Sequence, residues 1–227
     1  MTERFKAIAW DVDGTLVDSE PLHYQALVDV CGRYGYRING IDEETFLGVS
    51  ITDVWEHIRD NLPEDLLRED WLVAIDRYYV EHSRTIGVQK GAAELIERSA
   101  RAGIRQVCVS NSNREVVEAN LAVMGVAQHM EFLVCLDEVT NGKPAPEPYA
   151  LACRKLGIAP RDVLAVEDSR TGAASALAAG LPVAIVGSMA SSGAATFGRF
   201  VSLVELGYAL FGASAPKGLR EPVSAGQ

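Results

Sequence analysis

The alternation of short apolar segments with helix-length segments is the sequence feature that most constrains the fold. The apolar segments lie at residues 6–10, 106–109, 132–136, 163–166 and 182–186. The helical segments between them lie at residues 91–101, 113–124, 148–156 and 169–179. Short apolar runs are typical of strands buried on both faces, and their alternation with helices predicts an α/β, doubly wound, mostly parallel sheet. Such a sheet binds ligands beyond the carboxyl ends of its strands.

The segment from residue 17 to residue 88 interrupts this alternation. Its pattern predicts helices over residues 21–34, 51–61 and 64–84. An apolar face is expected on the last of these helices, formed by Leu67, Trp71, Ala74, Ile75 and Tyr78. We therefore expect a catalytic core made of residues 1–16 and 89–212, and a helical cap domain made of residues 17–88. Alternatively, these helices only cover the sheet. Residues 213–227 are rich in Gly, Ala, Ser and Pro and are expected to form a disordered tail.

The charge balance excludes some classes of function. The chain has 31 acidic and 21 basic residues among 227, and its formal net charge is −10. This balance argues against a nucleic-acid partner, because such proteins cluster positive charge on one face. The sequence shows neither a signal peptide nor a stretch of eighteen apolar residues, and its four cysteines lack paired spacing. We expect buried, reduced thiols, a cytoplasmic location and no membrane partner.

Two aspartates follow the first apolar segment, in the order Asp11-Val12-Asp13-Gly14. Carboxylates this close repel each other, so they require a cation or a shared proton. Gly14 allows the backbone to turn sharply beside a ligand. The same tetrapeptide also occurs as an ordinary turn, but its place at the end of a buried strand favours a functional site.

Polar residues also follow the second apolar segment, where Ser110 and Asn111 precede a helix. Ser112 and Glu115 have the spacing of a capping box, which predicts that the helix begins here. The free N–H groups of a helix N-terminus suit a phosphate, and Ser110 adds a hydroxyl group. Alternatively, these residues only end the strand and cap the helix.

A lysine lies in the stiff loop that follows the third apolar segment. Lys143 is followed by three prolines within five residues, which restrict the backbone of the loop. Held in this way, its ammonium group would neutralise an aspartate nucleophile and incoming phosphoryl oxygens. Alternatively, Lys143 is a solvated surface residue.

Consecutive acids, Glu167 and Asp168, follow the fourth apolar segment. Acids beside a core are costly unless a cation or hydrogen-bond donors compensate them. Asp168 suits Mg²⁺, which binds a few carboxylates, carbonyls and waters. Alternatively, Asp168 or Ser169 only caps the next helix.

Together, these four motifs resemble those of the haloacid-dehalogenase-like phosphohydrolase superfamily, over about residues 5–190. The resemblance implies a Rossmann-like core with a helical cap inserted after the first motif. It implies that Asp11 is the nucleophile and forms an aspartyl-phosphate, and that Asp13 is the general acid/base. Dehalogenases of this superfamily lack the second acid, so Asp13 favours phosphoryl chemistry.

The same resemblance assigns the remaining site residues. Ser110 and Asn111 would bind the phosphate of the substrate, and Lys143 would hold the phosphoryl charge. The metal would be Mg²⁺, bound by Asp11, Asp168, the backbone carbonyl of Asp13 and, directly or through water, Glu167.

Substrate selection is assigned to the cap, where the sequence is less informative. His23 either contacts substrate or lies on a helix surface. Gly48-Val49-Ser50 resembles the cap loop of sugar-phosphate mutases and related phosphatases, but Ile51 replaces the arginine that commonly follows in the mutases.

The resulting hypothesis is a phosphatase of a small phosphorylated metabolite, of the sugar-phosphate or phosphoglycolate type, that is a monomer or a weak homo-oligomer. A beta-phosphoglucomutase-like isomerase is the alternative, and a non-catalytic binding protein is a third hypothesis.

Overall fold

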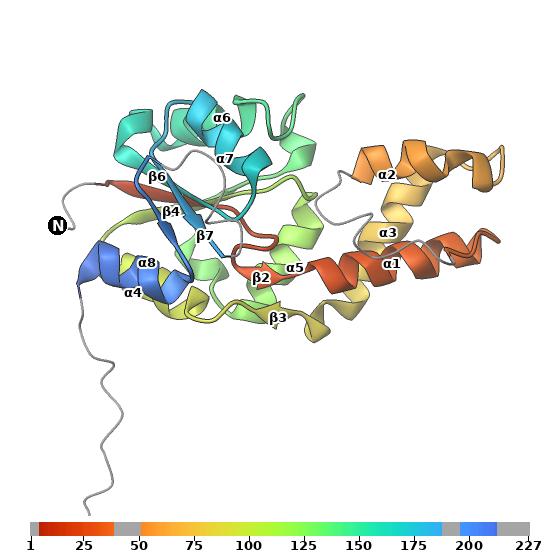
Figure 1. The fold of residues 1–227 in the computed structure, drawn as a ribbon, viewed down its shortest axis with the longest axis horizontal. Coiled ribbons are helices and arrows are strands. Elements are labelled where there is room, and N and C mark those ends of the chain that lie inside the picture. Colours follow the sequence, from red (N-terminus) through yellow and green to blue (C-terminus); the bar gives the residue numbers. More distant parts are fainter. Residues whose placement is uncertain (1–4, 39–50, 188–195, 213–227) are drawn as a thin grey trace, which may run out of the picture.

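The computed structural model describes residues 5–38, 51–187 and 196–212. Its centre is a six-stranded sheet with the order β5-β4-β1-β6-β7-β8, in which each neighbouring pair is parallel (Figure 1). The strands are β1 (Ala7–Trp10), β4 (Arg105–Val109), β5 (Leu133–Val134), β6 (Val163–Glu167), β7 (Val183–Val186) and β8 (Gly198–Phe200). The predicted parallel α/β sheet is therefore confirmed.

Helices cover both faces of this sheet (Figure 1). They are α4 (Ala92–Arg101), α5 (Arg114–Met124), α6 (Glu147–Leu156), α7 (Arg170–Ala178) and α8 (Leu203–Phe211). Apolar side chains of α4, α5 and α8 pack in one buried cluster, and those of α6 and α7 pack in a second cluster. Short 3₁₀ turns complete the connections: η5 (Ala127–His129), η6 (Leu136–Glu138) and η7 (Pro160–Asp162).

The strand β1 contributes side chains to both buried clusters. Ile8 and Trp10 belong to the first cluster, and Ala7 and Ala9 to the second, because successive side chains of a strand point to opposite faces. The buried Trp10 indole donates a hydrogen bond to Gln106 Oε1 at 3.0 Å. The strand is therefore fixed from both faces, and its carboxyl end lies at a defined place between β4 and β6.

A second group of helices lies beside the sheet, and we call α1 (Glu20–Arg33), α2 (Ile51–Ile58) and α3 (Arg68–His82) the cap helices (Figure 1). The turns η3 (Arg59–Asn61) and η4 (Ser83–Thr85) follow α2 and α3. The chain enters and leaves this group through a small antiparallel pair, β2 (Val17–Asp18) and β3 (Gly87–Val88). Among the described residues, no helix combines the length and the apolar character that crossing a membrane requires.

Two sequence predictions for this region need correction. Leu67 does not join the apolar face of α3: it precedes the helix and is 60% exposed, whereas Trp71, Ile75 and Tyr78 are buried as expected. Sequence reasoning also missed β2, β3 and β8, because strands of two or three residues are too short to show a period, and it missed the nine-residue helix α8. The predicted tail, residues 213–227, and Gly48 lie outside the described residues.

Candidate active site

Predicted site residues from three strands meet at one edge of the sheet because these strands are parallel. Asp11 follows β1, and its N–H donates to Val166 O at 3.0 Å. Ser110 follows β4, and Asp168 follows β6 on the other side of β1. This arrangement is the carboxyl edge at which such sheets bind ligands.

Lys143 joins two of the acids in a buried ion-pair group. Its Nζ lies 2.6 Å from Asp11 Oδ1 and 2.7 Å from Glu167 Oε1. The side chains of Lys143, Asp11 and Glu167 are only 3%, 9% and 0% exposed. The alternative of a solvated surface lysine is therefore wrong.

The buried acids carry more negative charge than Lys143 neutralises. Ligand atoms of Asp11, Glu167 and Asp168 all lie within 4.8 Å of one another. Burial raises the pKa of Asp11, and burial together with the neighbouring carboxylates raises the pKa of Glu167 to about 7 and that of Asp168 to about 8. In addition, the buried Asp11 Oδ2 has no hydrogen-bond partner among the described residues. An oxygen donor set with surplus charge and an unpaired carboxylate oxygen fits a divalent cation.

Asp13 points away from this acidic cluster and is held by several donors. Its Oδ2 accepts hydrogen bonds from Ser112 Oγ at 2.8 Å and Ser110 Oγ at 3.1 Å, and its Oδ1 accepts one from Asn120 Nδ2 at 3.2 Å. His23 Nε2 lies 3.6 Å from Asp13 Oδ1. Burial alone would raise the pKa of Asp13, but His23 and Ser112 outweigh it and lower the pKa to about 2. Asp13 therefore favours its ionised form in this arrangement, and the acid role expected from the sequence requires it to take up a proton before it acts.

The hydrogen bond from Ser112 corrects one sequence prediction. The helix does begin where expected, but its N-cap is Asn113, whose side chain makes no capping hydrogen bond. The Ser112 hydroxyl donates to Asp13 and is not used for the expected capping box.

Asn111 positions the lysine loop. Its Oδ1 accepts from Lys143 N at 2.7 Å, and its Nδ2 donates to Lys143 O at 3.0 Å. Gly142 permits this close approach, since a Cβ there would lie 2.8 Å from Asn111 Oδ1. Both ends of the Asn111 amide thus contact protein backbone, and its predicted contact with substrate stays a prediction.

Asp168 is held between two loops. Thr15 Oγ1 donates to Asp168 Oδ1 at 3.3 Å. Gly14 has a φ of +80°, and a Cβ there would lie 2.1 Å from Asp168 Oδ2, so this turn requires glycine. Ser169, not Asp168, caps α7, because Ser169 Oγ accepts from Gly172 N at 3.0 Å. Asp168 is therefore available to a ligand.

Sequence reasoning missed two buried residues of the site. Tyr149 on α6 donates a hydrogen bond to Glu167 Oε1, and its ring centroid lies 5.2 Å from Lys143 Nζ. An aromatic residue at helical spacing is typical of a core, so the sequence held no distinct signal for it. Asn120 did leave a signal, because it is a polar residue on the apolar face of α5.

Comparison with known proteins identifies the family of this chain. The model of the family described as haloacid dehalogenase-like hydrolase matches residues 8–186. Protein CbbY of Rhodobacter capsulatus is 36% identical over 191 residues, covering 79% of this chain and 84% of that protein. The N-acetylmuramic acid 6-phosphate phosphatase of Pseudomonas aeruginosa is 31% identical over 191 residues, covering 81% and 82% of the two chains. Among solved structures, CbbY from Rhodobacter sphaeroides in complex with xylulose-(1,5)bisphosphate aligns with a TM-score of 0.81 and 26% identity, covering 89% and 96%.

The chain belongs to the haloacid dehalogenase-like hydrolase family. This membership confirms the resemblance found in the sequence, including its phosphatase branch, and the expectation of a hydrolase.

Proposed function

We propose that this protein is a magnesium-dependent phosphatase that hydrolyses a small phosphorylated metabolite through an aspartyl-phosphate on Asp11. One observation carries the proposal: the buried Asp11 has one carboxylate oxygen on Lys143, and its other oxygen, beside Asp168 and Glu167, has no hydrogen-bond partner in the part of the chain that the structure describes. A carboxylate placed in this way is ready to bind a cation and to attack phosphorus.

In the first step, the Asp11 carboxylate attacks the phosphorus atom, and the bond from phosphorus to the leaving oxygen breaks. Asp13 in its protonated form gives a proton to that oxygen, which then leaves as an alcohol. In the second step, a water molecule attacks the phosphorus, Asp13 takes a proton from the water, and the bond to Asp11 breaks. One acid/base therefore serves both steps.

The remaining residues of the site supply the charge that phosphoryl transfer requires. Lys143 offsets the charge of Asp11 and of the phosphoryl oxygens, and Asn111 and Tyr149 keep Lys143 and Glu167 in place. Asp11 and Asp168, with the carbonyl of Asp13 and with Glu167 directly or through water, would hold Mg²⁺. A bound Mg²⁺ would neutralise charge on the phosphoryl group.

The names of the relatives support the proposed substrate class, since one of them is a phosphatase of N-acetylmuramic acid 6-phosphate. We propose a sugar phosphate or phosphoglycolate as the substrate and residues 17–88 as the cap domain that selects it. The proposal also includes a monomer or weak homo-oligomer and a cytoplasmic location, which four buried, unpaired thiols support.

The test is phosphate release from a panel of sugar monophosphates, sugar bisphosphates and phosphoglycolate, with Mg²⁺ and with a chelator. We expect release with Mg²⁺, loss of at least about a hundredfold with the chelator, and recovery when Mg²⁺ is returned. Asp11→Asn is the control, because it is nearly isosteric and removes the nucleophile. Release that persists in chelator would contradict the metal site, and release by Asp11→Asn would contradict the nucleophile.

The panel also separates the alternative function. Conversion of glucose 1-phosphate to glucose 6-phosphate in the presence of its bisphosphate activator, without phosphate release, would identify a mutase. The absence of any turnover would instead favour a binding protein.

A further inference from the structure

A chain of two hydrogen bonds joins a cap helix to the acid/base. The Tyr79 hydroxyl on α3 donates to Asn120 Oδ1 at 2.9 Å, and Asn120 Nδ2 donates to Asp13 Oδ1 at 3.2 Å. Tyr79 and Asn120 are both 0% exposed. Water therefore does not compete for these hydrogen bonds, and their geometry is set by the packing of α3 against α5.

The donor and acceptor groups of Tyr79, Asn120 and Asp13 determine the direction of the two hydrogen bonds. Both oxygens of Asp13 accept hydrogen bonds, and Oδ1 accepts the one that comes from the NH₂ end of the Asn120 amide. The Tyr79 hydroxyl satisfies the carbonyl end of that amide. Without this hydroxyl, Asn120 would either leave a buried oxygen unpaired or turn that oxygen toward the carboxylate. Tyr79 therefore fixes the orientation in which Asn120 meets Asp13.

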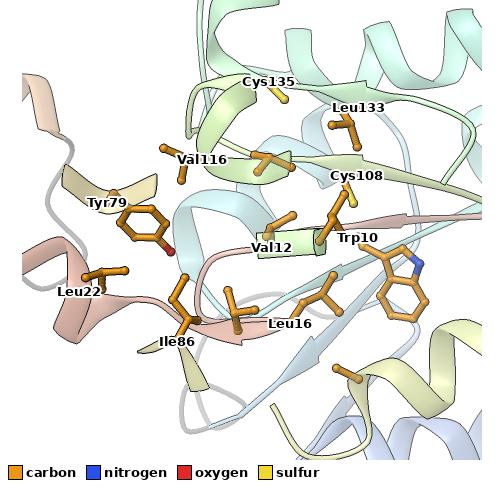
Figure 2. Close-up of a cluster of buried hydrophobic side chains, with 14 of the residues drawn as sticks. Trp10, Val12, Leu16, Leu22, Tyr79, Ile86, Cys108, Val116, Leu133 and Cys135 are labelled. Carbon is orange, nitrogen blue, oxygen red and sulfur yellow. The ribbon is translucent and has the colours of Figure 1, made fainter. Parts of the chain in front are cut away.

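The surroundings of both residues hold them in place. Tyr79 lies in the buried apolar cluster with Leu22, Ile86 and Val116 (Figure 2). The His23 ring, whose Nε2 also approaches Asp13, lies 4.4 Å from the Tyr79 ring. Tyr79 thus contacts two of the groups that surround Asp13.

Burying an amide side chain on the apolar face of α5 costs free energy. Val116, Val117 and Leu121 occupy the positions around Asn120, and an apolar side chain in its place would avoid burying two polar ends. The amide is useful there only through its partners, Tyr79 and Asp13.

We propose that Asn120 and Tyr79 are positioning residues that align Asp13 for proton transfer to the leaving oxygen, an inference that rests on the proposed function. When the bond from phosphorus to the leaving oxygen breaks, its electron pair goes to that oxygen, which takes the proton of Asp13. This transfer requires the carboxyl oxygen of Asp13 to lie within hydrogen-bond reach of the leaving oxygen. Because Tyr79 lies on α3, the alignment depends on the position of the cap helices.

The test compares two aryl phosphates whose leaving groups differ in their need for a proton. p-Nitrophenolate leaves without protonation, whereas the phenolate of phenyl phosphate depends on the acid. The quantity measured is kcat/KM, because it reports only the steps up to departure of the leaving group. Tyr79→Phe removes only the hydroxyl, and Asn120→Leu removes only the amide at similar volume.

We expect each variant to lower kcat/KM for phenyl phosphate about tenfold, a part of the ~10²–10⁴-fold that a positioned acid contributes. For p-nitrophenyl phosphate we expect a loss below about twofold. Tyr78→Phe is the matched control: Tyr78 is the buried neighbour on the same helix, its ring stacks on His82, and both substrates should react as with wild type.

If Tyr79 and Asn120 had only a structural role, their substitution would lower kcat/KM equally for both substrates, and that result would overturn the inference. No loss of kcat/KM in either variant would also overturn it. The two proposals fail differently. Wild-type protein that releases phosphate neither from the aryl phosphates nor from the panel of sugar phosphates and phosphoglycolate contradicts the phosphatase function itself. Wild-type protein that hydrolyses both while the variants keep the wild-type ratio contradicts only the positioning role.

Discussion

Lys143 carries the positive charge on which the buried carboxylates of the site depend. Its ammonium group contacts Asp11 and Glu167, and both pairs are almost completely removed from solvent. Removing one partner of a buried ion pair leaves an uncompensated charge, whereas removing a surface pair changes little.

Lys143→Met tests this dependence at the scale of one residue. We expect loss of phosphatase activity and a free energy of unfolding lower by about 3–5 kcal/mol, because two acids remain buried without their cation. Chemical denaturation measures the change. Lys155→Met is the control, since Lys155 pairs with Glu138 and is 37% exposed, and we expect a change of about 0–1 kcal/mol. Equal stability of Lys143→Met and wild type would contradict the role of the ion pairs.

The sequence identified some of these residues and missed others for a physical reason. Asp11, Lys143 and Asp168 could be predicted because each follows a buried strand, and parallel strands necessarily end at one edge. Tyr149 could not, because its contact with Glu167 depends on how α6 packs on the sheet. Ser112 was identified with the wrong role, since the same hydroxyl suits a helix cap and a carboxylate.

At the scale of the element, the start of α7 is fitted closely to Glu167. A Cβ on Gly172 would lie 1.9 Å from Glu167 Oε2, and Glu167 cannot move away because Lys143 and Tyr149 hold its other oxygen. Glycine is therefore required here although it lowers helix stability.

Gly172→Ala should consequently destabilise the protein, against the usual helix preference for alanine. We expect thermal unfolding at lower temperature, with a free-energy loss of about 1–3 kcal/mol from overpacking. Gly207→Ala in α8 is the matched control, because its Cβ would lie 3.4 Å from Leu95 Cδ1, an ordinary contact. That variant should gain about 0.5–1 kcal/mol. A stabilised Gly172→Ala would show that α7 and Glu167 adjust freely.

The contact between α3 and the start of α5 gives a prediction that depends on pH. Asp76 Oδ2 accepts a hydrogen bond from Asn113 Nδ2 at 2.6 Å. Burial, and then the charges of Glu115 and Asp137, raise the pKa of Asp76 above its ordinary value of 3.8. A raised carboxyl pKa means that ionisation favours the unfolded state. This penalty is absent below 3.8, grows as the pH rises through the raised value, and is complete above it.

Asp76→Asn should therefore raise the melting temperature more at pH 8 than at pH 4, since asparagine keeps the shape and removes the charge. Thermal unfolding of both proteins across this range measures the difference. A gain that is the same at both pH values would contradict the assigned ionisation of Asp76.

At the scale of the whole molecule, the parallel sheet and its helices could be predicted better than the strands that connect the sheet to the cap helices. The sheet could be predicted from five short apolar segments and the helical segments between them. Strands that are buried on both faces of a sheet appear in the sequence as continuous apolar runs. The pair β2 and β3, through which the chain enters and leaves the cap helices, has two residues in each strand and no sequence period. Its pairing depends on the two segments being brought together by the rest of the fold.

The same packing predicts the reactivity of the four cysteines, which lie in different parts of the molecule. Cys31, Cys108, Cys135 and Cys153 are all buried free thiols. Burial raises the pKa of Cys108, and it raises the pKa of Cys31 and Cys153 to about 11 and that of Cys135 to about 12. Since the thiolate is the reactive form, a disulfide reagent at pH 8 should react with the native protein roughly a hundredfold or more slowly than with the unfolded chain.

Unfolding in guanidinium should then release all four thiols together, because α1, β4, the end of β5 and α6 are parts of one packed structure. The measurement is the number of reactive thiols against denaturant concentration, compared with the loss of helix signal. Cys31 is the informative one, because it lies on a cap helix. If one thiol reacts at lower denaturant than the other three and Cys31→Ala removes that early phase, the cap helices unfold independently of the sheet.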